Sequence, residues 1–243
     1  MIRTFFVFLF IVLFLIITLP LDLVLYIMSK KNPDLQIRIC RKIIHWAFSF
    51  ILWICGVKIE ADGQENIPDE AVLFVGNHQS YLDILTTYVS IKGGTGFVSK
   101  IEMDKVPVFN LWMRGINCLF LDRDNIREGI KTIKKGTEEL KKGYSMFIFP
   151  EGTRNQAEEM LEFKAGSTKM AEKANVPILP VAISGTADIF ENNPHFSVKP
   201  GKVRITFGKP IIINDLAKEE RRFLSGYTQN IIKDMLDAHK AEI

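Results

Sequence analysis

The chain has 243 residues, enough for one domain with a substantial core and a short appendage. Its formal net charge of +3 suits an anionic membrane surface or a phosphate-bearing ligand, but it is too small to indicate nucleic-acid binding. The three cysteines, Cys40, Cys55 and Cys118, have unrelated spacings. They argue against a disulfide framework or a zinc site and indicate free thiols in a reducing compartment.

The N-terminal part of the chain is strongly apolar. Residues 5–18 form an unbroken apolar run that continues past Pro20 and Asp22, and a second apolar stretch covers residues 43–55. The segment between them is rich in lysine and arginine. A spanning helix needs about 20 apolar residues. Residues 5–21 barely provide that length, and we expect Pro20 and Asp22 to interrupt the helix.

The sequence allows three arrangements of these two apolar segments. Residues 5–21 could span a bilayer, with the basic link on its cytoplasmic side. Both segments could instead form a helical hairpin embedded in one leaflet, with the basic residues at the headgroups, or both could pack as core helices of a soluble domain. We expect residues 1–56 to form a membrane-associated hairpin and residues 57–243 to form a domain at the cytoplasmic face of a membrane, in a bacterium the inner membrane.

Beyond Gly56, short β-rich runs alternate with helical patterns. The expected strands cover residues 57–61, 71–75, 95–99, 117–121, 145–149, 178–183 and 203–207. Helical patterns cover residues 81–90, 126–142, 165–175 and 215–241. Strands that alternate with helices predict an α/β fold, with a largely parallel mixed sheet flanked by helices.

A polar cluster follows the expected strand at residues 71–75. It reads Asn-His-Gln-Ser-Tyr-Leu-Asp over residues 77–83. In such sheets ligands collect at the carboxyl ends of strands. His78 there can act as a general base, and Asp83, early in the next helix, could fold back to orient it. Ser80 and Asp83 also fit a capping box for that helix, with His78 as a turn residue.

Other expected strand ends carry charged or proline-rich clusters. The strand at residues 145–149 is followed by Pro-Glu-Gly-Thr-Arg, in which Arg154 is suited to bidentate phosphate contact; a plain turn with a surface Glu–Arg pair is the alternative. Arg123 ends a Phe-Leu-Asp-Arg run and could be a second phosphate contact or part of a solvated loop. The prolines of residues 176–181 most simply shape the next strand.

These four blocks occur together in a known family. The sequence resembles the lysophosphatidic acid acyltransferases of the glycerolipid acyltransferase superfamily, whose signature contains N-H-x-S-x-x-D, F-[IL]-D-R, F-P-E-G-T-R and V-P-[IV]-x-P-V. All four are present in family order, and the resemblance covers residues 57–207. The chain departs from the family at Asn117, where glycine is usual, and at Asn155, where serine is frequent.

The resemblance implies a reaction and roles for individual residues. His78 would take the proton of the acceptor hydroxyl while Asp83 orients it, and the oxygen would attack an acyl thioester directly. The acceptor would be lysophosphatidic acid, acylated at its sn-2 hydroxyl. Arg123 and Arg154 would hold the acceptor's phosphate, and Glu151 would bind its free hydroxyl or brace an arginine.

Beyond the resemblance, the oxyanion needs donors, for which we expect backbone N–H groups of the turn Glu151, Gly152 and Thr153. We also expect Lys105, just before the aromatic segment 106–113, to lie near the phosphate.

The resemblance also implies the partners. The donor would be acyl-carrier protein or coenzyme A carrying the acyl group, with no further cofactor and no metal, and the protein would act at a lipid bilayer. Glycerol-3-phosphate or another lyso-lipid could replace lysophosphatidic acid as the acceptor. The chain could also be a thioesterase or phospholipase, in which water replaces the alcohol, or a catalytically idle membrane-binding module.

The aromatic segment 106–113 would line the acyl chain's path, dip into the membrane, or pack as a core helix. The oligomeric state has no signal in the sequence.

Overall fold

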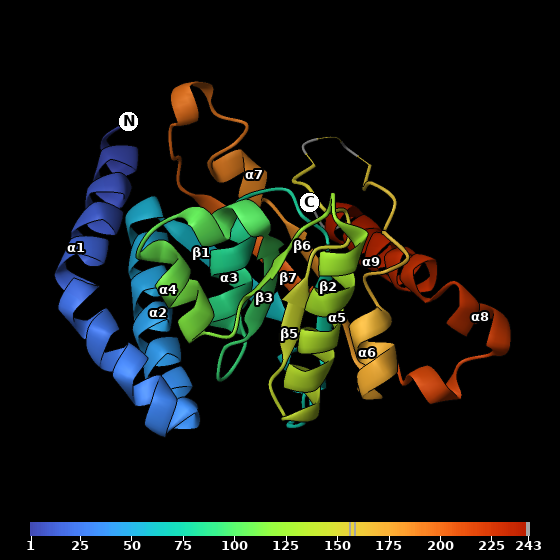
Figure 1. Cartoon of the computed structure of the whole chain (residues 1–243). Helices are drawn as coiled ribbons and strands as arrows, with labels where there is room; N and C mark the ends of the chain where they lie inside the picture. The colour runs from blue at the N-terminus through green and yellow to red at the C-terminus, as the bar shows by residue number, and fades with distance from the viewer. Residues whose placement is uncertain (156, 158, 242–243) are drawn as a thin grey trace.

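The chain folds around a seven-stranded sheet with helices on both faces (Figure 1). The computed structural model describes residues 1–155, 157 and 159–241. The strand order is β1-β7-β6-β2-β5-β3-β4. The strands are β1 (Val57–Asp62), β2 (Leu73–Gly76), β3 (Gly96–Lys100), β4 (Leu119–Leu121), β5 (Met146–Ile148), β6 (Ile178–Ser184) and β7 (Gly201–Phe207).

The sheet is largely parallel. Strands β6, β2, β5, β3 and β4 run in one direction, while β1 and β7 pair in parallel with each other and β7 runs antiparallel to β6. Each predicted strand is present within a few residues of its expected position, and the predicted α/β class is confirmed. The carboxyl ends of five strands therefore meet at one edge of the sheet.

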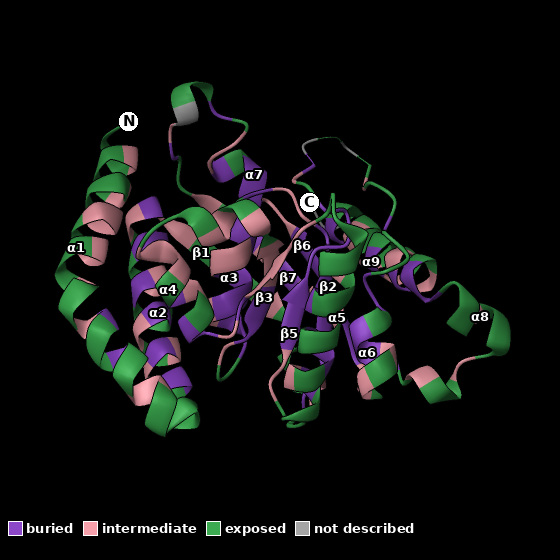
Figure 2. Ribbon diagram, viewed as in Figure 1, coloured by how far each residue is buried: buried purple, intermediate pink, exposed green. Residues whose placement is uncertain are grey.

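The central strands are apolar throughout because helices cover both faces of the sheet. Side chains alternate between two cores: Phe74 and Phe147 belong to one, and Leu73, Val75 and Met146 to the other. The first core is covered by α2 (Pro33–Cys55), α3 (Leu82–Ser90) and α4 (Phe109–Gly115). The second is covered by α5 (Ile126–Lys141), α6 (Lys169–Ala174) and α9 (Leu224–Ala241). Figure 2 shows the buried strands between the more exposed helices.

Two expected helices differ from the structure. The helix expected at residues 165–175 is shorter and forms α6 only. The single helix expected at residues 215–241 is wrong: the chain forms η4 (Ile213–Asp215), α8 (Lys218–Arg222) and α9. α8 begins where Glu220 accepts the backbone N–H of Ala217, at 2.9 Å. The break after α8 leaves Phe223 66% exposed and brings Leu224 into the core at 2% exposed.

The N-terminal helix α1 (Ile2–Lys31) is continuous, so the expected interruption at Pro20 and Asp22 is wrong. A proline removes one helical hydrogen bond, and here packing outweighs that cost. In α1, the Phe10 ring lies 4.7 Å from that of Phe50 on α2, and the Phe14 ring lies 5.3 Å from that of Trp112 on α4.

The basic segment expected as a link between the apolar runs is instead helical. Only Asn32 separates α1 from α2, and its side chain accepts the N–H of Leu35 at 3.1 Å as an N-cap. Pro33 is the first residue of α2, where its missing N–H costs nothing. At the other end, Gly56 has a φ of 73°, a left-handed conformation that turns the chain from α2 into β1.

The two N-terminal helices share a core with the sheet. Cys40, Ile44 and Leu52 of α2 lie in the same apolar cluster as Phe74. Trp112 is 3% exposed and donates its indole N–H to Thr18 of α1 at 3.1 Å, so at this residue the segment 106–113 packs as a core helix. The division of the chain at residue 56 stays a prediction, because the helices before it and the sheet after it pack together.

Phe147 is the test of this core, since its ring is fully buried and lies against three other phenylalanine rings. We expect Phe147→Ala to lower the free energy of unfolding by about 3–5 kcal/mol, because it loses buried area and leaves a cavity. Urea denaturation followed by circular dichroism measures the change. Phe223→Ala, at an exposed ring, is the matched control and should change it by less than about 0.5 kcal/mol. Equal costs for the two variants would contradict the assignment of the core.

Candidate active site

The predicted site residues meet at the edge formed by the carboxyl ends of the parallel strands. Asn77, His78 and Asp83 follow β2, Arg123 follows β4, and the Pro-Glu-Gly-Thr-Arg segment follows β5. Asn77 fixes the end of β2 against β6: its amide donates to the carbonyl of Ile183 at 2.9 Å and accepts the N–H of the same residue at 2.8 Å. Residues far apart in the sequence are thus held at one edge.

His78, which is half-buried, and Asp83 form a hydrogen-bonded pair. His78 Nδ1 lies 2.8 Å from Asp83 Oδ2, and the Asp83 side chain is fully buried. The same oxygen accepts the backbone N–H groups of Gln79 and Ser80, at 2.7 and 2.8 Å. The other oxygen accepts the Thr186 hydroxyl at 2.5 Å. Because Asp83 engages Nδ1, the Nε2 atom of His78 is the nitrogen left for proton transfer.

The capping interpretation and the base interpretation of this segment are compatible. Asp83 accepts the N–H of Ser80, which is half of a capping box, and the Ser80 hydroxyl accepts the N–H of Leu82 at 3.0 Å. One carboxylate therefore stabilises the start of α3 and orients the imidazole of His78.

The segment after β5 fixes His78 from its other side. The imidazole stacks on the Phe149 ring, with 4.1 Å between ring centroids. The backbone N–H of His78 donates to Glu151 Oε1 at 2.7 Å, and its carbonyl accepts the N–H of Asn155 at 2.7 Å. Glu151 Oε2 accepts the N–H of Leu161 at 3.0 Å. Both oxygens of Glu151 thus brace backbone, and burial raises the pKa of this carboxyl while these hydrogen bonds oppose the shift.

Two arginines lie at the same edge. Arg123 donates from Nη1 to the carbonyl of Gly152, which joins the segment after β4 to the segment after β5. Arg154 lies over the Tyr81 ring, 3.6 Å from its centroid, and pairs with Glu191 at 3.1 Å. Each guanidinium group thus contacts a segment next to His78: Arg123 contacts the segment after β5, and Arg154 contacts the segment after β2.

The remaining predicted site residues differ in their surroundings. Lys105 ends η2 (Ile101–Lys105), the short helix after β3, and it is exposed, as is Thr153. The N–H of Gly152 closes its turn by donating to the carbonyl of Phe149 at 3.1 Å. Oxyanion binding by the 151–153 turn stays a prediction, and the N–H of Gly152 already has this partner.

The two departures from the family pattern have local explanations. Asn117 has a φ of 65°, the left-handed region that glycine adopts freely and asparagine tolerates better than most residues. Asn155 holds the carbonyl of His78 through its own N–H, and its side-chain oxygen accepts the N–H of Ala157 at 2.9 Å.

Sequence reasoning missed two residues of the site, Thr186 and Glu191. Thr186 opens α7 (Thr186–Ile189), just after β6, so a polar residue at that strand end was the available signal. Glu191 lies beyond α7, and no local pattern marks it, because its partners Tyr81 and Arg154 are distant in sequence.

Comparison with known proteins gives consistent matches. The family model described as Acyltransferase matches residues 58–184. The probable 1-acyl-sn-glycerol-3-phosphate acyltransferase of Mycoplasma pneumoniae is 30% identical over 220 residues, 81% of each chain. Its counterpart in Mycoplasma genitalium is 32% identical, over 82% of this chain and 78% of that protein. The crystal structure of the 1-acyl-sn-glycerophosphate (LPA) acyltransferase PlsC from Thermotoga maritima superposes with a TM-score of 0.79 at 27% identity, covering 99% of this chain and 95% of that one.

Because several hydrogen-bond donors surround Asp83, we expect even the conservative substitution of this residue by asparagine to destabilise the fold. Asp83→Asn replaces one accepting oxygen by an NH₂ group, so at least one buried donor loses its partner. We expect the free energy of unfolding to fall by about 1–3 kcal/mol, measured by urea denaturation. Asp234→Asn, at an exposed position on α9, makes the same chemical change and should have little effect. If both variants are as stable as the wild type, the carboxylate is not held as described.

Proposed function

The chain belongs to the acyltransferase family, with 1-acyl-sn-glycerol-3-phosphate acyltransferases as its relatives, and we propose that it transfers a fatty acyl group from an acyl thioester to the sn-2 hydroxyl of lysophosphatidic acid. The product is phosphatidic acid, the central intermediate of phospholipid synthesis. The observation that carries this proposal is the hydrogen-bonded His78–Asp83 pair at the carboxyl edge of the sheet, where Arg123 contacts Gly152 and Arg154 contacts Tyr81.

The proposed mechanism is direct transfer with His78 as general base. Nε2 takes the proton of the sn-2 hydroxyl as its oxygen attacks the thioester carbonyl carbon. The carbon–sulfur bond then breaks, and the leaving thiolate receives the proton from the imidazolium. Asp83 holds the tautomer that exposes Nε2 and stabilises the imidazolium between the two proton transfers.

The surroundings of Cys118 are consistent with a mechanism that uses no enzyme nucleophile. Burial raises the pKa of the Cys118 thiol to about 12, which is the opposite of the shift that activates a cysteine. Among the described residues, Asp83 is the one side chain hydrogen-bonded to the imidazole of His78, so no serine or cysteine is held at Nε2. These features favour attack by the acceptor alcohol itself.

In the proposed complex, Arg123 and Arg154 bind the acceptor phosphate. Arginine suits this role because its planar fork matches two phosphate oxygens at once. Lys105 is exposed at the end of η2, the short helix after β3, and in this complex it would add a third positive charge. The donor would present its thioester to the same edge, from either acyl-carrier protein or coenzyme A.

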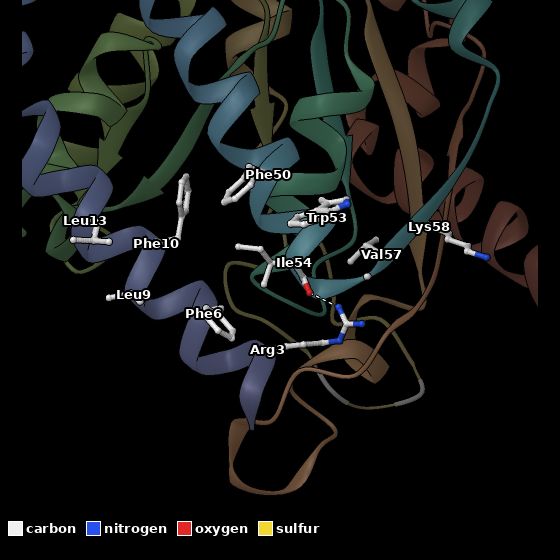
Figure 3. Close-up of a pocket in the computed structure, with 11 residues that line it drawn as sticks. Arg3, Phe6, Leu9, Phe10, Leu13, Phe50, Trp53, Ile54, Val57 and Lys58 are labelled. Carbon is white, nitrogen blue, oxygen red and sulfur yellow. Dashed lines mark hydrogen bonds between the residues drawn. The ribbon is translucent and has the colours of Figure 1, made fainter.

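We propose that α1 and α2 hold the protein against the cytoplasmic leaflet of a membrane. α1 is the one helix in the described part of the chain that is long and apolar enough to span a bilayer. No residue of its most apolar 18-residue window is fully buried, although Phe10 and Phe14 are half-buried against α2 and α4. An open apolar groove of about 850 Å³ lies between the first half of α1 and the end of α2, where Phe10 faces Phe50 and Arg3 and Lys58 mark the edges (Figure 3).

Contacts along the whole of α1 favour a hairpin in one leaflet over a single span. Thr4 accepts the backbone N–H of Val198 at 3.0 Å, and Thr18 accepts the indole N–H of Trp112. Leu25 lies in the same core cluster as the sheet residue Phe74. Because α1 is attached near its start, middle and end, it could not cross a bilayer without taking polar parts of the domain with it.

The catalytic proposal is tested with His78→Ala. We expect transfer of a labelled acyl thioester to lysophosphatidic acid to fall about 10²–10⁴-fold, because general-base catalysis is lost. The control is His45→Ala, at an exposed histidine of α2, which should retain activity. Circular dichroism checks that both variants fold. Persistent transfer by His78→Ala would sink the mechanism, and wild-type hydrolysis of the thioester with no acylated product would indicate a thioesterase.

The membrane proposal is tested by tryptophan fluorescence. Trp46 and Trp53 on α2 are 57% and 72% exposed, whereas Trp112 is 3% exposed. We expect vesicles containing lipids with brominated acyl chains to quench the emission strongly, since the exposed rings would contact the chains. A variant with both Trp46→Phe and Trp53→Phe retains only Trp112 and should be quenched much less. Vesicles that leave the wild-type emission unchanged would contradict insertion of this face.

A further inference from the structure

Glu191 is a buried acidic residue outside the four sequence blocks that make the site recognisable. It lies in the connection between β6 and β7, beyond α7, and its side chain is 3% exposed. Its Oε1 atom accepts the backbone N–H of Tyr81 at 2.9 Å and the Nη1 of Arg154 at 3.1 Å. Its Oε2 atom is buried without a hydrogen-bond partner among the described residues.

Such a carboxylate is costly unless a charge compensates it. The guanidinium of Arg154 supplies that charge, so the position of Arg154 and the burial of Glu191 depend on each other. Removing either partner would leave the other poorly compensated at the edge of the site.

Two different contacts hold the guanidinium of Arg154. The Tyr81 ring lies against its face, and Glu191 engages one edge. A guanidinium has five N–H donors, and the Arg154 side chain is 33% exposed, so N–H groups remain for a ligand. This arrangement orients the fork before a phosphate binds, which reduces the ordering cost of binding.

The segment that carries Glu191 also braces the proposed base. Thr186, five residues earlier, donates its hydroxyl to Asp83 at 2.5 Å. In lysophosphatidic acid the glycerol sets the distance from the phosphate to the sn-2 hydroxyl. Arg154, which would bind the phosphate, and His78, the proposed base, therefore need a fixed separation. Residues 186–191 connect Thr186, which contacts Asp83, to Glu191, which contacts Arg154.

We propose that Glu191 is a positioning residue that holds Arg154 in the orientation that binds the acceptor phosphate. This inference rests on the proposed function, because it requires Arg154 to contact the acceptor. Glu191 does not touch the substrate and acts through Arg154. It therefore determines affinity for the acceptor and has little effect on the chemical step.

The experiment is a double-mutant cycle on the full chain with lysophosphatidic acid as the varied substrate. Wild type, Glu191→Ala, Arg154→Ala and the double variant are compared by kcat and by KM for the acceptor. We expect Glu191→Ala to raise this KM about tenfold, as loss of a charge-assisted contact would, with kcat changed less than about threefold. In the Arg154→Ala background the same substitution should change KM less than about twofold.

Two further variants separate positioning from a general structural role. Glu191→Gln keeps the shape and the acceptor oxygen, so it should restore part of the lost affinity, and it replaces Glu191→Ala in the cycle if that variant does not fold. Glu65→Gln, at an exposed residue, is the matched control and should behave as wild type.

The outcomes distinguish this inference from the proposed function. An equal rise in KM with and without Arg154, or a fall in kcat alone, would overturn the positioning role of Glu191. Arg154→Ala with an unchanged acceptor KM would instead remove Arg154 from the phosphate site, and the proposed function would lose that contact. A raised KM for Arg154→Ala beside an unaffected Glu191→Ala would overturn the inference alone.

Discussion

The buried carboxylate of Asp83 is the interaction on which the rest of the site depends. A carboxylate without solvent is tolerated only when hydrogen bonds compensate it. Four donors do so here: two backbone N–H groups before α3, the imidazole of His78, and the hydroxyl of Thr186 after β6. The same carboxylate thus holds together the segment after β2, the start of α3 and the segment after β6. The orientation of the proposed base is a consequence of these contacts.

The parallel sheet makes this convergence possible. Each strand of the parallel part delivers its carboxyl end to one edge, so loops distant in sequence meet there. They then hold one another: Glu151 and Asn155 fix the backbone of His78, and Arg123 holds the carbonyl of Gly152. Electrostatic catalysis needs groups that are already oriented before the reaction. Here the orientation comes from contacts between loops rather than from any single loop.

The N-terminal helices give the protein the apolar surface that we propose lies against a bilayer. α1 exposes large apolar side chains such as Phe8 and Ile17, while α2 packs on the sheet through residues such as Ile44 and Leu52. A contiguous exposed apolar surface on a folded protein is typical of a site that binds a membrane or a partner. An acyltransferase whose acceptor and product reside in a bilayer can use it to stay beside both.

The sequence alone predicted the strands and the polar residues at their carboxyl ends, because both depend on local patterns of a few neighbouring residues. The β2 run is apolar because both faces of this parallel strand are buried, and His78 and Asp83 stand five residues apart just after it. The tertiary structure decided what depends on distant partners. Because α1 packs on α2 and α4, it stays helical across Pro20. Burial of Leu224 breaks the expected C-terminal helix. Thr186 and Glu191 join the site only because the fold brings them to Asp83 and Arg154, across more than a hundred residues in the first pair.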